Sequence, residues 1–581
     1  MLVCAASGTV AAEVPYSATL TVAPGEGDLE QRLRDIAQTL RRQDDPPESR
    51  GALARRVADD RRGITDTLRA LGYFDSRVES SIDRNASPIA VTITVEPGPL
   101  YLVRDVTLAV PAGAAALPDD FPAAETFGVA LGDPVRSADI LAAEGTILTR
   151  LGEAGRPLAK RVDRRIVVDH ALRAASVTWI IDPGPAARFG ETRIEGLVDA
   201  REAMVRRRIQ WRPGQPYDSR QVDATRKALA EASLFSSIRI APAEQVGPDG
   251  TIPMTMTLAE GERRSVGGGL KYSTSTGIGT EIFWEHRDLF GNGERVRLSG
   301  TFAEQQLGAN ATYRRPYFLS DNQDLVASLG LADEKPPAYD NRFLRVHGGV
   351  ERRFPPQWRV GAGLQYERQE VTAHGRTGTY DLVSLPTFVR RDTSDDLLNP
   401  TRGYRTTVTV APYLGAGDGA LGFLKLRVDQ TGYWRLDEEG RWVLAASASI
   451  GSLIGAGRSE VPAPQRFYAG GGGSVRGFGY QMAGPVDATG DPLGGKSLLT
   501  GGAELRIKVT DTIGIVPFIE AGTVTDSSLP GFGDRLLVGA GIGLRYYTSF
   551  GPVRLDVATP LNRRDGVDDL VQVYISLGQA F

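Results

Sequence analysis

The sequence predicts an α+β repeat region followed by an all-β transmembrane barrel of about 16 antiparallel strands. Two observations carry this prediction. Before about residue 262, a pattern of strand, Pro-Gly turn and strand recurs at a spacing of roughly 80 residues. After about residue 264, the hydrophobic period becomes two and continues to the final residue, Phe581. A repeat of this length is long enough to form its own small hydrophobic core. A hydrophobic period of two indicates strands whose two faces differ in polarity.

Composition sets the outer limits of this prediction. The chain has 581 residues, too many for one ordinary core, so several domains are expected. Its 67 basic and 71 acidic residues give a net charge of -4, which provides no overall basic field for a nucleic acid. The single cysteine, Cys4, excludes an intrachain disulfide and a cysteine metal cluster.

Membrane spans, if present, must be strands. The sequence contains no run of about 18 apolar residues, the length that a transmembrane helix requires. A transmembrane strand needs only about 10 residues with every second one apolar.

The first residues read as a signal remnant or a tail. Residues 1–12 are mostly apolar or small, and Val10, Ala11 and Ala12 have the form of a signal cleavage site. The basic segment that opens a signal peptide is missing. We therefore interpret residues 1–14 either as the remnant of a leader, left by a late start or a trimmed precursor, or as a disordered tail.

The repeat region contains three related segments. Residues 91–99 and 177–185 each end in Pro-Gly-Pro and lead into a second strand, and residues 254–261 are a degenerate third copy. A segment with helical apolar spacing precedes each strand pair. These patterns place three α+β units at residues 15–99, 100–185 and 186–262, before a barrel at residues 263–581. Three generic α+β modules that bind another ligand are the alternative.

The second half alternates in a way that favours a membrane barrel. In residues 536–547 the even positions are large or apolar, while the odd positions include three glycines and Arg545. Pleating sends the two sets to opposite faces, one suited to lipid and one to a polar lumen. A soluble sandwich also alternates, with its apolar face inward. Long strands, charges of both signs on the polar face and a terminal aromatic favour the barrel.

A glycine-rich loop carries a family resemblance. Residues 470–480 contain Val475, Arg476, Gly477 and Phe478, a Val-Arg-Gly-Phe motif at the tip of a flexible segment. With the surrounding strands, this motif resembles the outer-membrane assembly-factor, or BamA-like, superfamily, whose barrels fold such a loop into the lumen. Residues 518–522 resemble its Phe-x-Asp-x-Gly strand, with Glu520 in place of Asp. Residues 392–403 resemble its Asp…Pro-x-x-Gly turn, and residues 551–556 its Gly-Pro strand start.

The resemblance extends to the repeat region and implies a function. The three units look like POTRA domains, so the fold class becomes α+β POTRA domains followed by a transmembrane barrel. BamA-type relatives usually have five units and two-partner secretion transporters two, so three units look most like the TamA type. This implies a non-enzymatic, cofactor-free factor in the bacterial outer membrane, with POTRA domains in the periplasm, that inserts barrel proteins such as autotransporters.

The same resemblance implies partners and leaves alternatives. Its partners would be a TamB-like inner-membrane-anchored protein, unfolded outer-membrane protein clients captured on exposed strand edges, and membrane lipids. Alternatives are a BamA-like insertase, a pore like those of two-partner secretion, and a partner in lipid transport to the outer membrane.

Arg476 is the first candidate site. The resemblance places its side chain at the loop tip, against an acidic group on the barrel wall. Glu520 and Glu504 are the candidate partners, because an arginine can form two hydrogen bonds with one carboxylate. The extra methylene of Glu520, relative to Asp, leaves the choice between them open. The alternative is an ordinary solvated arginine.

The seam between the first and last strands, residues 265–273 and 571–581, is the second candidate site. Gly267, Gly268 and Gly269 in the first strand, and Gly578 in the last, remove side-chain packing from their pairing. We interpret these glycines and Phe581 as a lateral gate that opens to lipid and offers a free edge to incoming strands. The alternative is that the glycines relieve crowding at a bend.

Other motifs do not lead to a chemical site. Residues 490–497 satisfy the phosphate-loop pattern, but an alternating strand, not a helix, is expected after them. The four histidines lack the spacing of metal ligands, and no Gly-x-Ser-x-Gly nucleophile turn is present. We therefore expect no catalytic residue, metal or cofactor.

Overall fold

A computed structural model describes residues 13–23, 28–274, 276–417, 421–531, 535–548, 551–577 and 579. Most of the expected signal remnant, and both Gly578 and Phe581 of the expected gate, lie outside these residues. The chain divides into two compact units. One comprises residues 1–195, 209–227 and 239–257, and the other residues 196–208, 228–238 and 258–581.

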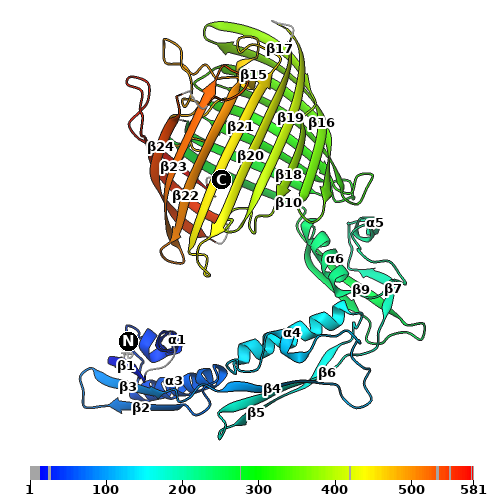
Figure 1. Cartoon of the computed structure of the whole chain (residues 1–581), viewed down its shortest axis with the longest axis vertical. Helices are drawn as coiled ribbons and strands as arrows, with labels where there is room; N and C mark the ends of the chain where they lie inside the picture. Colours follow the sequence, from blue (N-terminus) through cyan, green and yellow to red (C-terminus); the bar gives the residue numbers. More distant parts are fainter. Residues whose placement is uncertain are drawn as a thin grey trace, which may run out of the picture. The chain divides into compact units, whose positions relative to one another are not determined.

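The first sheet shows how each repeat is built (Figure 1). Its strand order is β1-β3-β2, with β1 parallel and β2 antiparallel to the central β3. Val91, Ile93 and Val95 are buried because alternate positions of β3 face the helices, whose Ile64 and Leu68 belong to the same core. The elements are β1 (Tyr16–Val22), α1 (Leu29–Ile36), α2 (Gln38–Arg41), α3 (Arg50–Ala70), β2 (Arg77–Asp83) and β3 (Ile89–Glu96).

The next two sheets repeat this topology, with orders β4-β6-β5 and β7-β9-β8. In both, the first strand runs parallel to the central strand. The second set comprises β4 (Leu102–Ala109), η1 (Ala124–Phe127), α4 (Ser137–Glu153), β5 (Lys160–Asp169) and β6 (Ala174–Asp182). The third comprises β7 (Arg188–Glu195), α5 (Glu202–Arg206), α6 (Ser219–Glu231), β8 (Phe235–Pro242) and β9 (Thr251–Glu260). Among the described residues, no helix is long and apolar enough to cross a membrane.

The remaining strands close into one antiparallel barrel, from β10 to β26 (Figure 1). Two of them, β17 and β18, occupy one place, because both pair with β16 and β19 on either side of a break at Leu385 and Pro386. The wall therefore has sixteen positions, and the predicted fold class is confirmed.

The barrel strands run as follows. They are β10 (Arg264–Ser273), β11 (Gly277–Arg287), β12 (Arg295–Ala303), β13 (Gln306–Arg315), β14 (Gln323–Glu334), β15 (Asp340–Phe354), β16 (Trp358–Ala373), β17 (Arg376–Ser384), β18 (Thr387–Asp392), β19 (Gly403–Gly417), β20 (Leu421–Arg435), β21 (Trp442–Ile454), β22 (Ser497–Lys508), β23 (Ile513–Thr525), β24 (Leu537–Thr548), β25 (Gly551–Pro560) and β26 (Gln572–Leu577). We call the end at which β10 begins the proximal end, and the other the distal end. The last strand, β26, is described as far as Leu577, and residues 578, 580 and 581 of its expected range lie outside the described residues.

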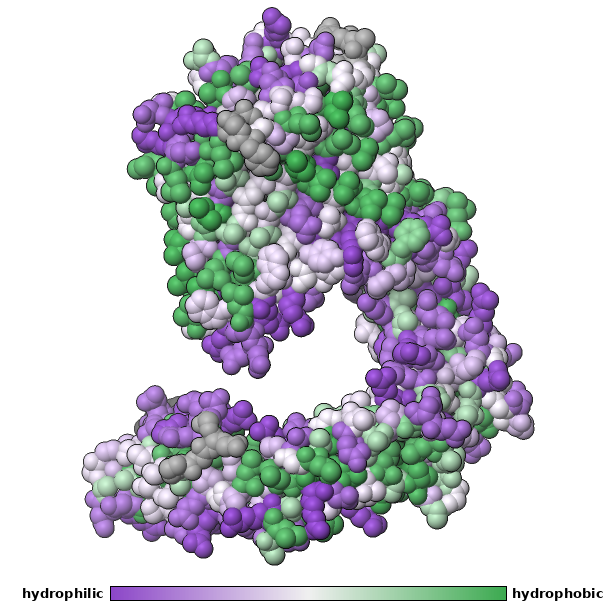
Figure 2. Space-filling model, in the orientation of Figure 1, coloured by the Kyte–Doolittle hydropathy of each residue, from purple (hydrophilic) through white to green (hydrophobic). Residues whose placement is uncertain are grey.

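The outer face of the barrel wall is apolar, as the alternation predicts. Figure 2 shows hydrophobic side chains spread over this wall. On β24, Ile542, Leu544 and Tyr546 are exposed, whereas Arg545 between them is buried. Hydrophobic side chains thus face outward and a charged side chain faces inward. This arrangement is the reverse of that in a soluble β-sandwich.

The inner face is less polar than the sequence predicts. The long connection between β21 and β22 contributes Val461, Phe467, Val475 and Phe478 to an apolar core inside the barrel. The same core includes apolar residues of the wall that face into the barrel. The connection between β21 and β22, and not another sheet, buries them. These are Leu382, Tyr413, Phe423, Leu453 and Leu498. Part of the expected wet lumen is therefore a packed core.

Candidate functional site

Glycines let the connection between β21 and β22 turn sharply inside the barrel. Gly470, Gly471 and Gly477 have φ angles of 106°, 91° and 103°, which side-chain-bearing residues rarely adopt. A Cβ atom on Gly470 would lie 2.4 Å from the Gly479 carbonyl oxygen, and one on Gly477 would lie 2.8 Å from that of Thr559. The backbone itself thus fills the space beside the wall, which brings Arg476 to the acidic residues there.

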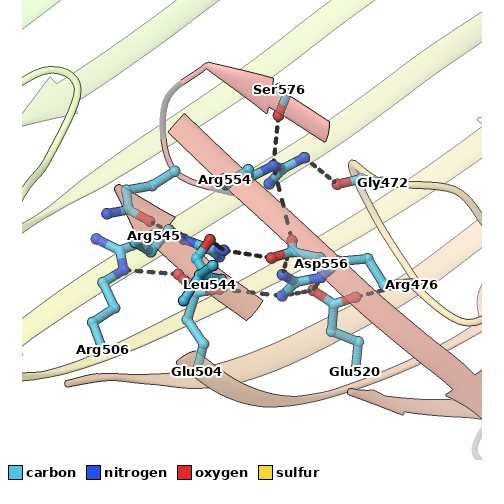
Figure 3. Close-up of polar contacts among 11 residues, drawn as sticks. Gly472, Arg476, Glu504, Arg506, Glu520, Leu544, Arg545, Arg554, Asp556 and Ser576 are labelled. Carbon is cyan, nitrogen blue, oxygen red and sulfur yellow. Dashed lines mark hydrogen bonds and ion pairs between the residues drawn. The ribbon is translucent and has the colours of Figure 1, made fainter. Parts of the chain in front are cut away.

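Arg476 binds three carboxylates at once (Figure 3). Its Nε and Nη2 donate to Glu520 Oε1 at 2.9 and 2.6 Å, and its backbone N–H donates to Glu520 Oε2 at 2.7 Å. Nη1 donates to Asp556 Oδ2 at 2.8 Å, and Nη2 to Glu504 Oε2 at 3.2 Å. The guanidinium carbon lies 3.5 Å from the ring centroid of Phe518. The side chain is fully buried, so it is not a solvated arginine.

Three further arginines complete the cluster, which joins β22 to β25 across their inner faces. Arg506 donates to Glu504 at 2.7 Å, and Arg545 donates to Asp556 at 2.5 Å. Arg554 lies 3.8 Å from Asp556 and also donates to the Gly472 carbonyl oxygen of the loop at 3.2 Å. Charges buried this deeply are tolerated only when they are paired and hydrogen-bonded, so each carboxylate depends on its arginines.

The loop also touches the last strand. Tyr574 of β26 is buried, and its hydroxyl donates to the Phe478 carbonyl oxygen at 3.1 Å. Arg554, already bound to the loop at Gly472, donates to Ser576 of β26 at 2.6 Å. The Val-Arg-Gly-Phe motif is therefore in contact with the strand that closes the barrel.

Sequence reasoning placed some of these residues and missed others. Both sequence candidates, Glu520 and Glu504, contact Arg476, with the denser set of bonds at Glu520. Asp556 was missed as a partner. Its signal was available, because alternation along β25 puts Asp556 on the same face as Arg554. Phe518 was missed as well, although alternation along β23 puts it on the same face as Glu520 and it begins the segment that resembles Phe-x-Asp-x-Gly.

Among the described residues, the seam has the fewest register partners of any junction in the wall. Strands β10 and β26 have two register partners, Tyr272 with Ile575 and Ser273 with Tyr574. Beyond them, Thr274 N–H donates to the Val573 carbonyl oxygen at 3.0 Å. On its other side, β10 pairs with β11 along its whole length, from residue 264 to residue 273. Within the described residues, the proximal part of β10 thus has no ladder partner on the side of β26.

The three glycines of β10 lie in this part and differ in their surroundings. A Cβ atom on Gly267 would lie 2.5 Å from the Phe283 ring, and one on Gly268 would lie 2.9 Å from the Glu281 carbonyl oxygen. A Cβ atom on Gly269 would meet nothing within 4 Å. Crowding therefore explains glycine at the first two positions but not at the third.

The remaining sequence motifs have ordinary structural places. The phosphate-loop pattern ends at Ser497, which begins strand β22 and no helix. No group of three metal-ligating side chains comes together in the part of the chain that the structure describes.

Comparisons with known proteins agree with this architecture. The Omp85 superfamily domain matches residues 288–581, and the first POTRA domain of TamA matches residues 19–97. Among curated relatives, the outer membrane protein assembly factor BamA of Neisseria meningitidis serogroup B is 23% identical, over 90% of this chain and 73% of that protein. BamA of Nitratidesulfovibrio vulgaris is 25% identical, over 70% of this chain and 53% of that protein.

A solved structure shares the fold. The crystal structure of BamA from Haemophilus ducreyi lacking POTRA domains 1-3 superimposes with a TM-score of 0.65 at 19% identity. The likeness covers 82% of this chain and 100% of that chain.

Proposed function

Because the chain belongs to the Omp85 superfamily, we propose that it promotes the insertion of β-barrel proteins into the bacterial outer membrane. The single observation that carries the proposal is the seam. A closed barrel in lipid must pair its backbone groups, and a junction held by two register partners is the place where opening costs least. The relatives BamA of Neisseria and Nitratidesulfovibrio are named as outer membrane protein assembly factors, which supports the same role.

In this proposal the two halves of the chain have separate tasks. Residues 15–99, 100–185 and 186–262 form three POTRA domains in the periplasm, and residues 263–581 form the barrel in the outer membrane. The POTRA domains bind unfolded clients, and the proximal edge of β10 accepts a client strand when the seam opens toward lipid. Backbone hydrogen bonds on such an edge bind many sequences, which suits a factor with several clients.

The more specific part of the proposal is a TamA-type role. The match of residues 19–97 to the first POTRA domain of TamA and the three sheets before the barrel support it. In that role the clients include autotransporters, and the partner is a TamB-like protein anchored in the inner membrane. Affinity capture with the isolated partner domain, followed by profiling of outer-membrane proteins and lipids after depletion, tests this part.

A disulfide across the seam tests the insertion mechanism. In a Cys4→Ser background, Tyr272→Cys with Ile575→Cys joins two register partners of β10 and β26. We expect that oxidation stops the insertion of an unfolded barrel client into liposomes that contain this protein, and that a reductant restores it.

The control joins two strands that stay paired in the proposed mechanism. Leu298→Cys with Ala311→Cys links register partners of β12 and β13, a junction separated from the seam by β10, β11 and β12. This pair should leave insertion unchanged in both redox states. Full insertion by the oxidised seam variant would overturn the proposal.

A further inference from the structure

The turn between β18 and β19, residues 393–402, lies at the proximal end and is ordered by its own carboxylates. Asp395 accepts hydrogen bonds from the backbone N–H groups of Thr401 and Arg402, at 2.8 and 3.1 Å. Asp396 accepts from those of Leu398 and Asn399, both at 2.7 Å. Side-chain oxygens that bind nearby N–H groups fix a turn in one shape. The turn is therefore a defined structural element.

This turn makes contacts far beyond its own strands. Arg435 of β20 donates to Thr401 Oγ1 at 2.6 Å, and Arg506 of β22 donates to the Pro400 carbonyl oxygen at 3.1 Å. Most distant is Gln579, after β26, whose Nε2 donates to Asn399 Oδ1 at 2.9 Å. Strands β20 to β25 lie between β19 and β26 in the wall. The turn thus reaches across the proximal end of the barrel to the end of the last strand.

Gln579 does not continue the alternation of β26. Along that strand, Tyr574 points inward and is buried, whereas Ile575 and Leu577 point outward and are exposed. A period of two would send the side chain of residue 579 outward, to the lipid side. Instead, Gln579 Oε1 accepts a hydrogen bond at 3.0 Å from Nε of Arg545, a fully buried residue on the inner wall.

The register of the seam shows what this displacement prevents. If the ladder set by Tyr272 and Ile575 continued toward the proximal end, Leu577 would oppose Leu270 and residue 579 would oppose Gly268. The observed register partners stop at Tyr272 with Ile575. A side chain bound inside the barrel by Asn399 and Arg545 cannot also occupy the outward place opposite Gly268.

The same contacts link the turn to the loop tip. Arg506, bound to the turn, donates to Glu504, and Arg545, bound to Gln579, donates to Asp556. Both carboxylates accept hydrogen bonds from Arg476. The turn, the end of the last strand and the Val-Arg-Gly-Phe loop are therefore held by one continuous set of polar contacts.

We propose that residues 393–402 act as a strap that holds the side chain of Gln579, just after the last strand, inside the barrel and so keeps the proximal part of β10 from pairing with β26. Asn399 and Gln579 are its positioning residues. The inference deepens the proposed function, since the strap preserves the free edge of β10 that a client strand would use. When the contacts of Gln579 with the strap break, β26 pairs further along β10 and the free edge of β10 is lost.

Cysteine cross-linking in the purified full chain measures this directly, without a client. In the Cys4→Ser background, Leu270→Cys with Leu577→Cys reports pairing beyond the observed register. Adding Asn399→Ala removes the acceptor for Gln579. We expect the yield of this disulfide to rise about three- to tenfold, the factor that corresponds to the loss of one neutral hydrogen bond.

Two further variants and one control cysteine pair make the result specific. Gln579→Leu removes the hydrogen bonds to both Asn399 and Arg545 and should give a rise at least as large. Heat-modifiable gel mobility reports whether each variant folds, so Gln579→Leu tests the strap even where Asn399→Ala does not fold. Leu397→Ala alters an exposed residue of the same turn and should give no rise. The pair Tyr272→Cys with Ile575→Cys should cross-link equally in every background.

The outcomes separate this inference from the proposed function. Unchanged cross-linking of residues 270 and 577 in both strap variants, with folded barrels, would overturn the strap. A rise in cross-linking together with normal client insertion would retain the strap and count against the seam as the route of insertion.

Discussion

The seam differs from the part of the wall that carries the arginine cluster in how its strands are held together. Strands β22 to β25 pair along most of their lengths, and four arginines and three carboxylates bind them together from inside. Among the residues that the structure describes, the seam has two register partners, and three glycines lie in the part of β10 beyond them. Buried ion pairs are thus concentrated on one side of β26, whereas the described polar contacts on its other side lie at the distal end of the seam, around Thr274. A barrel built this way can open at one junction while the rest of the wall keeps its shape.

The loop connects these two regions. Its arginine is buried in the cluster, and its backbone accepts a hydrogen bond from Tyr574, a residue of the seam itself. Weakening the cluster should therefore be felt at the seam, whereas weakening the seam should leave the cluster intact.

The largest effect is expected from Arg476→Ala. The change leaves Glu504, Glu520 and Asp556 buried with one fewer cation, and breaking a buried ion pair costs about 3–5 kcal/mol. We expect a barrel that still forms but melts at lower temperature, a loop that is cleaved by added protease, and impaired client insertion. Conductance in planar bilayers should rise because the loop no longer fills the lumen.

Arg441→Ala is the matched control for that variant. Arg441 is half-exposed and pairs with Glu439, in a connection at the proximal end. Exposed pairs of this kind contribute about 0–1 kcal/mol, so melting and insertion should be unchanged. If Arg476→Ala also kept full activity and a protected loop, the cluster would not be the anchor.

A smaller effect separates the two explanations of the seam glycines. Gly267→Ala places a methyl group 2.5 Å from the Phe283 ring, and forced overpacking costs about 1–3 kcal/mol. Gly269→Ala meets nothing within 4 Å and should not lower the melting temperature. It should nevertheless reduce insertion if glycine is needed there for a weak seam.

Thermal melting and insertion therefore have to be measured on both glycine variants. Normal insertion by Gly269→Ala would mean that crowding, and not gating, explains the glycines of β10. Loss of insertion without loss of stability would support the gate.

Much of this architecture follows from the sequence because it depends on local periodicity. Alternation identifies the two faces of β24 and the inward position of Glu504, and the Pro-Gly turns mark the repeats. What could not be predicted depends on contacts between residues far apart in the chain. Phe423 and Tyr413 face inward although they are apolar, since the loop covers them. The inward place of Gln579 violates the alternation that serves as the guide everywhere else.

The smallest effect is a pH dependence just before β10, the strand with the free edge. Burial alone would raise the pKa of Glu260, but hydrogen bonds from the backbone N–H groups of Ala200, Val198 and Asp199, at 2.8, 2.8 and 3.0 Å, lower it to about 2. Arg263 donates to the same carboxylate at 2.9 Å and adds to this lowering.

A carboxyl pKa that is lowered in the folded state contributes stability at pH values above the ordinary carboxyl pKa. This contribution is lost as the pH falls toward 2. We expect the amides of residues 198–200 to be strongly protected from exchange at pH 6, and their protection factors, the intrinsic exchange rate divided by the observed rate, to fall between about pH 4.5 and 2. Glu260→Gln should remove this pH dependence and cost about 1–2 kcal/mol locally at pH 6. The register of β10 with β11 should persist in that variant, because ten paired positions hold it. Lower protection in β10 as well would show that its pairing with β11 also depends on Glu260, and that the two edges of β10 differ less in stability.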